Sequence, residues 1–380
     1  MALIVGAVRT PTGRRNGALA GVHPADLSAL VLDALVSRAG VDPAEIDDVV
    51  WGCVSQIGEQ TFDIARTAVL SAGWPESVPG TTVDRQCGSS QQAVHFAAAG
   101  VTAGHYDLAV AGGVESMSRV PMGSPFAAGS PLGEAYTDRY GSSFPNQGLG
   151  AEMIAERWGL SRVQLDEFAL ASQEKAAAAQ DAGAFDEEVV PVPLAGGSEL
   201  RADEGVRRGG TLETLAGLKP AFREDGVLHA GNSSQISDGA AALLLATPEK
   251  AAALGLQPLG RVHSVALAGA DPNIMLTAPM PATEKVLARS GLDLDEIGVF
   301  EVNEAFASVP LAWLADIGAD EAKLNPLGGA IALGHPLGAS GARIMTTMLH
   351  HMRREGIRYG LQTMCEGGGM ANATILELVE

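Results

Sequence analysis

Two segments of this 380-residue chain carry the same pattern at a constant spacing of 251 positions. The first is SRAGVDPAEIDDVVWG, which ends at Gly52, and the second is ARSGLDLDEIGVFEVN, which ends at Asn303. The same spacing places the small-residue turn CGSSQQ, from Cys87, over the turn GASGAR, from Gly338. Because one spacing relates both matches, we interpret the chain as a duplication of a single α/β unit.

Each half alternates segments typical of strands and helices. In the first half we expect strands at 2–9, 47–54, 81–86 and 106–116, and helices at 23–40 and 90–104. In the second half we expect strands at 260–269, 298–304 and 359–369, and helices at 281–291, from 304 onward and at 341–356. Such alternation predicts parallel or mixed sheets that are covered by helices.

The region from about 117 to 232 breaks this alternation. It begins rich in Gly, Pro and Ser, continues with one clear helical stretch at 160–183, and then turns charged. Long irregular segments in compact proteins are usually lids or binding loops. We therefore predict a first half over 1–257, from which this region projects as an inserted loop domain, and a second half over 258–380.

Charge and cysteine content exclude several classes of protein. The formal net charge of −20 argues against a nucleic-acid partner, because phosphate contacts need clustered Lys and Arg. No apolar run is long enough to span a membrane, and the N-terminus does not have the pattern of a signal peptide. Three distant cysteines without C-x-x-C spacing favour free thiols in a reducing cytoplasm.

Cys87 lies where a short strand gives way to a helix. A thiol at a helix N-terminus is close to unpaired N–H groups and to the positive end of the helix dipole, so we expect a lowered thiol pKa and a nucleophilic thiolate. A small buried cysteine in an alanine-rich core is the alternative, and Cys87 alone does not decide between them.

Two further glycine-rich stretches strengthen the catalytic interpretation. His335 lies in NPLGGAIALGHPLGASGAR, just before the helix that pairs by duplication with the helix after Cys87. Cys365 ends a predicted strand and leads into three glycines, whose amides could hold an oxyanion. A lone histidine is more often structural, but a histidine with two cysteines at loop ends suggests acyl transfer through a thioester.

Six motifs in order resemble the thiolase family of acyl-CoA acyltransferases. They are VDRQCGSSQQA, GGVESMSRVPM, AGNSSQISDGAAA, VNEAFA, GGAIALGHPLGASGAR and CEGGGMAN, and they extend along nearly the whole chain. The resemblance implies a five-layered αβαβα fold, built from two similar halves with a loop domain inserted in the first.

The resemblance also implies a role for each matching residue. Cys87 would hold the acyl group as a thioester, and His335 would activate that thiol. Asn303 would hold a water in a first oxyanion hole, and Cys365 would move the proton at the α-carbon of acetyl-CoA. The N–H groups of Cys87 and Gly367 would form a second oxyanion hole, for the acyl-enzyme.

Coenzyme A and acyl-CoA are then substrates, with no permanently bound cofactor and no metal. Ser234 resembles a contact to the pantetheine arm, and Arg207 resembles a basic residue near the CoA nucleotide. Arg207 belongs to a basic cluster with Arg201, Arg208, Lys219 and Arg223. The resemblance further implies a homodimer or homotetramer and a cytoplasmic enzyme of fatty-acid metabolism, such as β-oxidation.

Two departures from the commoner family pattern concern the site. Glu366 follows Cys365 where an aliphatic residue is frequent, and a carboxylate there could raise the Cys365 pKa by like-charge repulsion or point away into solvent. Asn146 and Gln147 replace the His-Met pair of short-chain relatives, which suggests a pocket for a longer or bulkier acyl chain.

Two other functions remain as alternatives. A decarboxylating ketoacyl synthase shares the duplicated fold but would carry His or Asn in place of Cys365. A catalytically silent CoA or lipid carrier would not need Cys87, His335 and Cys365 together. The sequence leaves open the acyl chain, the direction of flux and the pathway.

Overall fold

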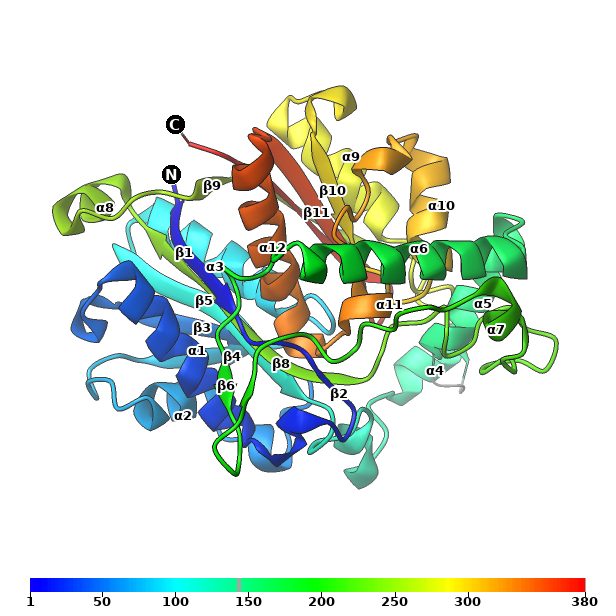
Figure 1. The fold of residues 1–380 in the computed structure, drawn as a ribbon, viewed down its shortest axis with the longest axis horizontal. Helices are drawn as coiled ribbons and strands as arrows, with labels where there is room; N and C mark the ends of the chain where they lie inside the picture. The colour runs from blue at the N-terminus through cyan, green and yellow to red at the C-terminus, as the bar shows by residue number, and fades with distance from the viewer. Residues whose placement is uncertain (142–144, 380) are drawn as a thin grey trace.

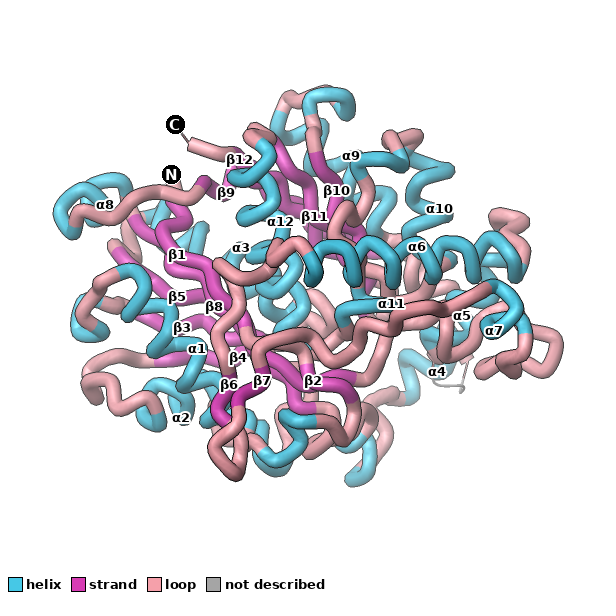
Figure 2. Tube along the Cα trace, viewed as in Figure 1, coloured by secondary structure: helices cyan, strands magenta, loops and turns pink. Residues whose placement is uncertain are grey.

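Two similar sets of strands form one continuous mixed sheet (Figures 1 and 2). The computed structural model describes residues 1–141 and 145–379. The first half contributes β1 (Leu3–Arg9), β2 (Gly13–Arg14), β3 (Asp48–Gly52), β4 (Gly80–Val83), β5 (Leu108–Ser116), β8 (Ser237–Ala246), α1 (Pro24–Ala39), α2 (Ile64–Ser71), α3 (Ser89–Ala103) and α8 (Pro248–Leu254). The second half contributes β9 (Gly260–Gly269), β10 (Val299–Val302), β11 (Tyr359–Glu366), β12 (Met370–Glu377), α9 (Pro279–Ser290), α10 (Ser308–Ile317), α11 (Ala330–Leu333) and α12 (Ser340–Glu355).

The two halves repeat the same strand order. The first half runs β3-β5-β8-β1 and the second runs β10-β11-β12-β9, each with one parallel pair followed by antiparallel pairs. The central strands β1 and β9 join the halves through two antiparallel residue pairs, Leu3 with Arg261 and Ile4 with Gly260. The matched helices α3 and α12 begin at Ser89 and Ser340, at the spacing seen in the sequence. The predicted duplication is therefore present in the fold.

Buried side chains form three large apolar layers. One lies under α1 and α2, on the outer face of the first-half strands, and another lies under α9 and α10 in the second half. The third lies between them, where α3 and α12 pack on each other and on both sets of strands. Helices, first-half strands, the pair α3 and α12, second-half strands and helices give the predicted five layers, with α12 visible between the halves in Figure 1.

Three predicted boundaries beside the site were wrong by three or four residues. One is the end of the strand expected at 359–369, which ends at Glu366. The strand expected at 81–86 ends at Val83, because the chain turns sharply and Gln86 takes a positive φ of 49°. The helix expected from 304 begins only at Ser308. Glu304 instead has its carboxylate tied to Ser172 Oγ (2.6 Å) and Asn325 Nδ2 (2.9 Å), which holds residues before the helix in an extended turn.

The region between β5 and β8 carries the elements that have no counterpart in the second half. They are α4 (Glu134–Tyr140), α5 (Gln147–Arg157), α6 (Arg162–Asp181), β6 (Val192–Pro193), β7 (Glu199–Leu200) and α7 (Leu212–Ala216). A capping box of Ser161 and Gln164 starts α6, which packs along α11 (Figure 1).

A fully buried arginine ties this region to the sheet. Arg9, at the end of β1, pairs with Glu188 (2.6 Å) and with Asp203 (2.7 Å). Both carboxylates belong to the part of the chain between β5 and β8, so the ion pairs fix that part against the first half. The boundaries of the inserted domain and of the two halves stay predictions. Among the helices of the described residues, none has the length and apolarity needed to cross a membrane.

Candidate active site

The turn before α3 positions Cys87. The positive φ of Gln86 is strained for a side chain other than glycine, and such residues concentrate at functional sites. The hydroxyl of Ser89 locks the turn, since it donates to the Gln86 carbonyl (2.6 Å) and accepts from the Arg85 N–H (2.9 Å). The thiol is therefore held at the N-terminus of a fifteen-residue helix.

The environment of the Cys87 thiol differs from the expectation. Its sulfur lies near the N–H groups of Cys87 and Gly367, and both lower its pKa. Burial and the nearby charge of Glu366 act in the opposite direction and raise the pKa of Cys87 to about 12. The predicted lowering by the helix terminus was wrong, because a thiol that is 7% exposed loses more from desolvation than it gains from two N–H groups. Cys87 needs a base.

The two duplicated helix starts meet beside this thiol. The Ala342 N–H donates to Ser90 Oγ (2.9 Å), and a Cβ on Gly341 would lie 2.3 Å from the Gln91 nitrogen. Only glycine allows that approach. Leu337, in the turn before α12, packs with Cys87 in one small apolar cluster. The fold thus brings together two turns that are 251 residues apart.

His335 lies in the turn before α12 and is 3% exposed. Its Nδ1 is 2.6 Å from Ser340 Oγ, and the Ser340 hydroxyl itself donates to the Pro336 carbonyl (2.8 Å). Because that hydroxyl proton is already used, Ser340 Oγ accepts from His335 Nδ1–H, and Nε2 carries the lone pair. Burial, helped by the charge of Arg343, lowers the His335 pKa to about 3, so the ring is neutral with its lone pair on Nε2.

Asn303 lies next to that basic nitrogen. Its Nδ2 is 3.5 Å from His335 Nε2, and its backbone N–H donates to the Thr363 carbonyl (3.1 Å) on β11. Its Oδ1 is buried and has no hydrogen-bond partner among the described residues. The unpaired amide oxygen can orient a small polar ligand or a water.

Cys365 is the penultimate residue of β11 and is 1% exposed. Burial raises the pKa of its thiol, and the charges of Cys87 and Glu366 raise it further, so the two thiols face the same space. The chain then turns through Gly367, Gly368 and Gly369 into β12. Cys87, Cys365 and Gly367 therefore lie together. His335 lies beside Asn303, two residues before Leu337, which packs with Cys87.

Glu115 is a site residue that the sequence analysis missed. Its buried carboxylate accepts from the N–H groups of Val54 (3.0 Å), Ser55 (3.1 Å) and Gly338 (2.9 Å) and from Gln60 Nε2 (2.7 Å). It thereby holds the turn after His335 against the end of β3. The sequence signal for this role was the single charged residue, in GGVES, near the end of an otherwise uncharged strand.

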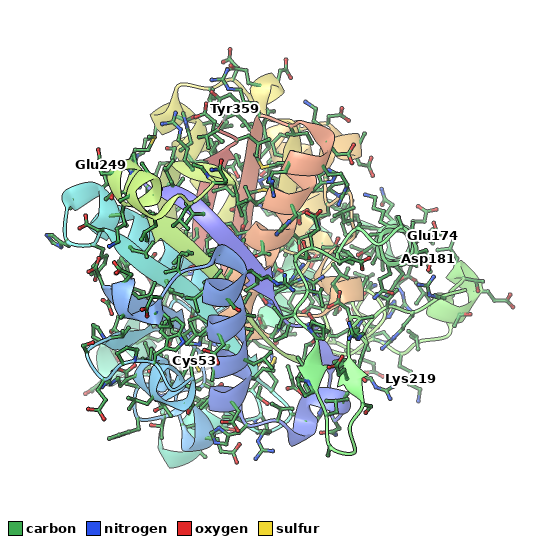
Figure 3. The ribbon with its side chains drawn as sticks, turned by 60° about the vertical axis from the view of Figure 1, so that its left-hand side comes forward. Cys53, Glu174, Asp181, Lys219, Glu249 and Tyr359 are labelled. Carbon is green, nitrogen blue, oxygen red and sulfur yellow. The ribbon has the colours of Figure 1, made fainter. Side chains whose placement is uncertain are left out.

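Ser234 borders this cluster, because the carbonyl of the next residue, Gln235, accepts from the His335 N–H (3.3 Å), whereas Arg207 lies at the surface. Ser234 is half-buried and donates its N–H to the Ala305 carbonyl (2.9 Å), while Arg207 is exposed and its N–H donates to Gln173 Oε1 (2.7 Å). The basic cluster is not one anion site, because three of its members pair with local carboxylates: Arg201 with Glu199, Arg208 with Asp181, and Arg223 with Glu156 and Asp225. Figure 3 shows Asp181 and Lys219 on the side of the molecule away from Cys53.

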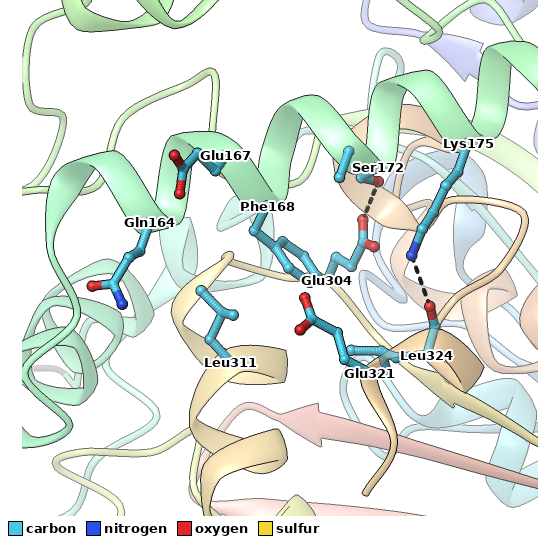
Figure 4. Close-up of a pocket in the computed structure, with 10 residues that line it drawn as sticks. Gln164, Glu167, Phe168, Ser172, Lys175, Glu304, Leu311, Glu321 and Leu324 are labelled. Atoms are coloured by element: carbon cyan, nitrogen blue, oxygen red, sulfur yellow. Dashed lines mark hydrogen bonds between the residues drawn. The ribbon is translucent and has the colours of Figure 1, made fainter.

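A pocket of about 400 Å³ lies between α6 and the second half (Figure 4). Its lining includes Glu304, Lys175 and Phe168, and the dashed contacts join Glu304 to Ser172 and Lys175 to the Leu324 carbonyl (3.0 Å). Asn303 precedes Glu304, so this pocket lies behind the site. Its polar groups hold one another and support the wall that carries Asn303.

Comparison with known proteins identifies the family. The family model for the thiolase N-terminal domain matches residues 2–249, and that for the thiolase C-terminal domain matches residues 256–378. The chain belongs to the thiolase family. This thiolase is an acyl-CoA acyltransferase, which confirms the prediction drawn from the motifs.

Full-length relatives agree with this assignment. The thiolase is 51% identical to a steroid 3-ketoacyl-CoA thiolase, FadA6, of Mycobacterium tuberculosis, over 99% of this chain and 94% of the relative. It is 46% identical to a beta-ketoadipyl-CoA thiolase of Escherichia coli, over 100% and 99%. It is also 46% identical to a 3-ketoacyl-CoA thiolase of Aliivibrio fischeri, over 99% and 98%. Thiolases act on CoA thioesters, so CoA compounds are the substrates.

Proposed function

We propose that the enzyme cleaves 3-ketoacyl-CoA with free CoA, or runs the reverse condensation, through an acyl thioester on Cys87. The observation that carries this assignment of roles is the protonation of His335. Its Nδ1–H is committed to Ser340, so the unprotonated Nε2 faces Asn303. A buried thiol with a raised pKa requires such a base.

In the first half-reaction His335 Nε2 takes the Cys87 proton, and the sulfur attacks the 3-keto carbon. The C2–C3 bond breaks, and its electron pair forms the enolate of acetyl-CoA. Asn303, with a water, stabilises the enolate oxygen, and Cys365 donates a proton to the α-carbon. Preorganised donors at such an oxygen lower the barrier by about 3–4 kcal/mol each.

In the second half-reaction the thiolate of Cys365 takes the proton of the incoming CoA thiol. The CoA sulfur then attacks the thioester carbon on Cys87, and the N–H groups of Cys87 and Gly367 hold the oxyanion. Their position at the Cys87 sulfur supports this role. Acyl-CoA leaves, and Cys87 takes back its proton from His335. Ser234 would contact the pantetheine arm and Arg207 the CoA nucleotide.

The acyl group that enters is larger than acetyl. Asn146 caps α5, accepting from Gly148 N–H (2.9 Å), and Gln147 Nε2 contacts the Met122 sulfur (3.5 Å). Neither side chain is the His-Met pair of short-chain enzymes. The steroid relative at 51% identity also favours a bulky or ring-bearing chain over acetoacetyl.

The cellular setting follows the family. We infer a cytoplasmic homodimer or homotetramer that works in a degradative, β-oxidation-like sequence. The relatives include enzymes named for steroid, ketoadipyl and general 3-ketoacyl substrates, so the pathway depends on the acyl group.

The test offers three substrates with free CoA: acetoacetyl-CoA, a medium-chain 3-ketoacyl-CoA and a ring-bearing 3-ketoacyl-CoA. Loss of the 3-ketoacyl enolate absorbance gives the rate. Cys87→Ala should abolish turnover, while Cys53→Ala, a buried cysteine in the first outer core, should retain it. Equal turnover by Cys87→Ala would overturn the role of Cys87, and a preference for acetoacetyl-CoA would overturn the bulky-chain proposal.

A further inference from the structure

Glu366 lies directly beneath the turn that carries Cys87. It is the last residue of β11 and is 0% exposed. A Cβ built on Gly88 would lie 1.9 Å from Glu366 Oε1 and 2.7 Å from Asn372 Oδ1, so both oxygens border the same point under the turn. The carboxyl group therefore points inward, toward the residue that follows Cys87, and not into solvent.

The side-chain oxygens of Glu366 and Asn372 accept no hydrogen bond of normal geometry from the described residues. Both carboxyl oxygens of Glu366 and Oδ1 of Asn372 are buried without a hydrogen-bond partner among the described residues. The Asn372 amide nitrogen lies 3.3 Å from Gln92 Oε1 and 3.2 Å from His95 Nδ1. His95 Nε2 in turn lies 2.7 Å from Thr374 Oγ1.

Acceptors thus face acceptors, and a proton resolves the conflict. If Glu366 is a neutral carboxylic acid, its O–H supplies a donor that can turn toward Asn372 Oδ1. If it is ionised, a buried charge stands beside another unpaired oxygen, which is costly. The geometry favours the neutral acid.

We propose that Glu366 is held as a neutral acid beneath Cys87 and that its ionisation opposes formation of the Cys87 thiolate, which makes Glu366 a positioning residue that limits acylation at alkaline pH. This rests on the proposed role of Cys87. A negative charge on Glu366 raises the free energy of a thiolate on nearby Cys87. The effect is reciprocal, because a thiolate on Cys87 also favours the protonated form of Glu366.

The charged and titratable groups around Glu366 support this. Burial, with a smaller effect of the Asp84 charge, raises the pKa of Glu366 to about 8 against the lowering by Arg85 and the Asn372 N–H. Cys87 lies near it in the turn and Cys365 precedes it on the same strand, and the charge of Glu366 raises the pKa of both thiols. His95, behind Asn372, stays neutral because burial lowers its pKa to about 3.

The experiment measures alkylation of Cys87 by iodoacetamide from pH 6.5 to 9.5, quantified on the Cys87 peptide by mass spectrometry. The proteins are the full chain, Glu366→Gln, Glu366→Leu and the exposed control Glu284→Gln. Gln keeps a donor for Asn372 and cannot ionise. We expect the rate of Glu366→Gln relative to the unsubstituted chain to rise by about threefold or more across this range, which corresponds to a half-unit change in thiol pKa. Glu284→Gln should follow the unsubstituted chain.

A ratio that stays constant with pH would overturn the proposal, since a merely structural role changes the rate equally at every pH. If Glu366→Gln melts early, Glu366→Leu gives the same comparison. The unsubstituted chain gives a third readout. Its alkylation rate should rise about tenfold per pH unit below pH 8 and less steeply above it, where Glu366 ionises. A plot of the logarithm of the rate against pH that stays straight contradicts the proposal. Alkylation does not need turnover, so an enzyme inactive with every 3-ketoacyl-CoA would contradict the proposed function while leaving this result readable.

Discussion

His335 and Ser340 form a 2.6 Å hydrogen bond in which the imidazole Nδ1–H donates to the hydroxyl oxygen. The bond has a fixed direction, because the Ser340 hydroxyl donates to the Pro336 carbonyl. It therefore selects the histidine tautomer whose Nε2 is free to take a proton. The residue that decides this lies in the first turn of α12, at the position that the duplication pairs with Ser89.

Ser340→Ala should lower kcat/KM for 3-ketoacyl-CoA by about tenfold, because the ring loses the acceptor that fixes its tautomer and orientation. Nitrogen NMR of the histidine-labelled enzyme should show a single Nδ1–H tautomer for His335 in the unsubstituted protein and a mixture in the variant. An unchanged tautomer together with a lower rate would mean that Ser340 acts only through packing.

Cys365→Ala should slow overall turnover by roughly 10²- to 10⁴-fold, the usual contribution of a general acid or base. Acylation of Cys87 by an acyl-CoA should slow by a smaller factor, because this step needs Cys365 only to protonate the departing CoA thiolate, which is a good leaving group, while His335 activates Cys87. Mass spectrometry of the intact protein after mixing with acyl-CoA measures that step. A variant that turns over normally would remove Cys365 from the mechanism.

Arg9→Met should destabilise the protein by about 3–5 kcal/mol, since it leaves Glu188 and Asp203 buried without their cation. Arg14→Met is the matched control. Arg14 is 68% exposed and its ion pair with Glu204 is long, at 3.9 Å, so its loss should cost less than about 1 kcal/mol. Urea unfolding at pH 7 measures both. Equal midpoints for the two variants would contradict the anchoring role of Arg9.

Glu366→Gln should stabilise the fold in a pH-dependent way. The unfolded chain releases the Glu366 proton near pH 4.5, whereas the folded chain keeps it to about pH 8. Between these values the unfolded state binds fewer protons, so the stability of the unsubstituted protein falls as pH rises and levels off above pH 8. The variant lacks this loss, so its advantage in unfolding free energy should grow from pH 5 to pH 8.5, reaching about 2–4 kcal/mol. Parallel urea titrations at the two pH values decide it, and an advantage that shrinks with pH would contradict the buried-acid assignment.

The sequence by itself determined the architecture and the family. The repeat spacing of 251 residues predicted that α3 and α12 are counterparts, and they begin at Ser89 and Ser340. Glycine-rich turns located Cys87, His335 and Cys365, because a backbone that must pass close to a ligand or to another helix needs glycine, as Gly341 against Gln91 shows. The repeat and the glycine-rich turns reflect local chain conformation, so they can be recognised directly in the sequence.

Tertiary structure decided the electrostatics. The helix terminus at Cys87 predicted a lowered thiol pKa, but burial and Glu366 raise it, and neither effect is encoded near residue 87 in the chain. The tautomer of His335, the support from Glu115 and the inward direction of Glu366 depend equally on partners brought together only by packing. Desolvation and charge act through space, over a few ångströms, so they become defined only when distant segments of the chain enclose the same point.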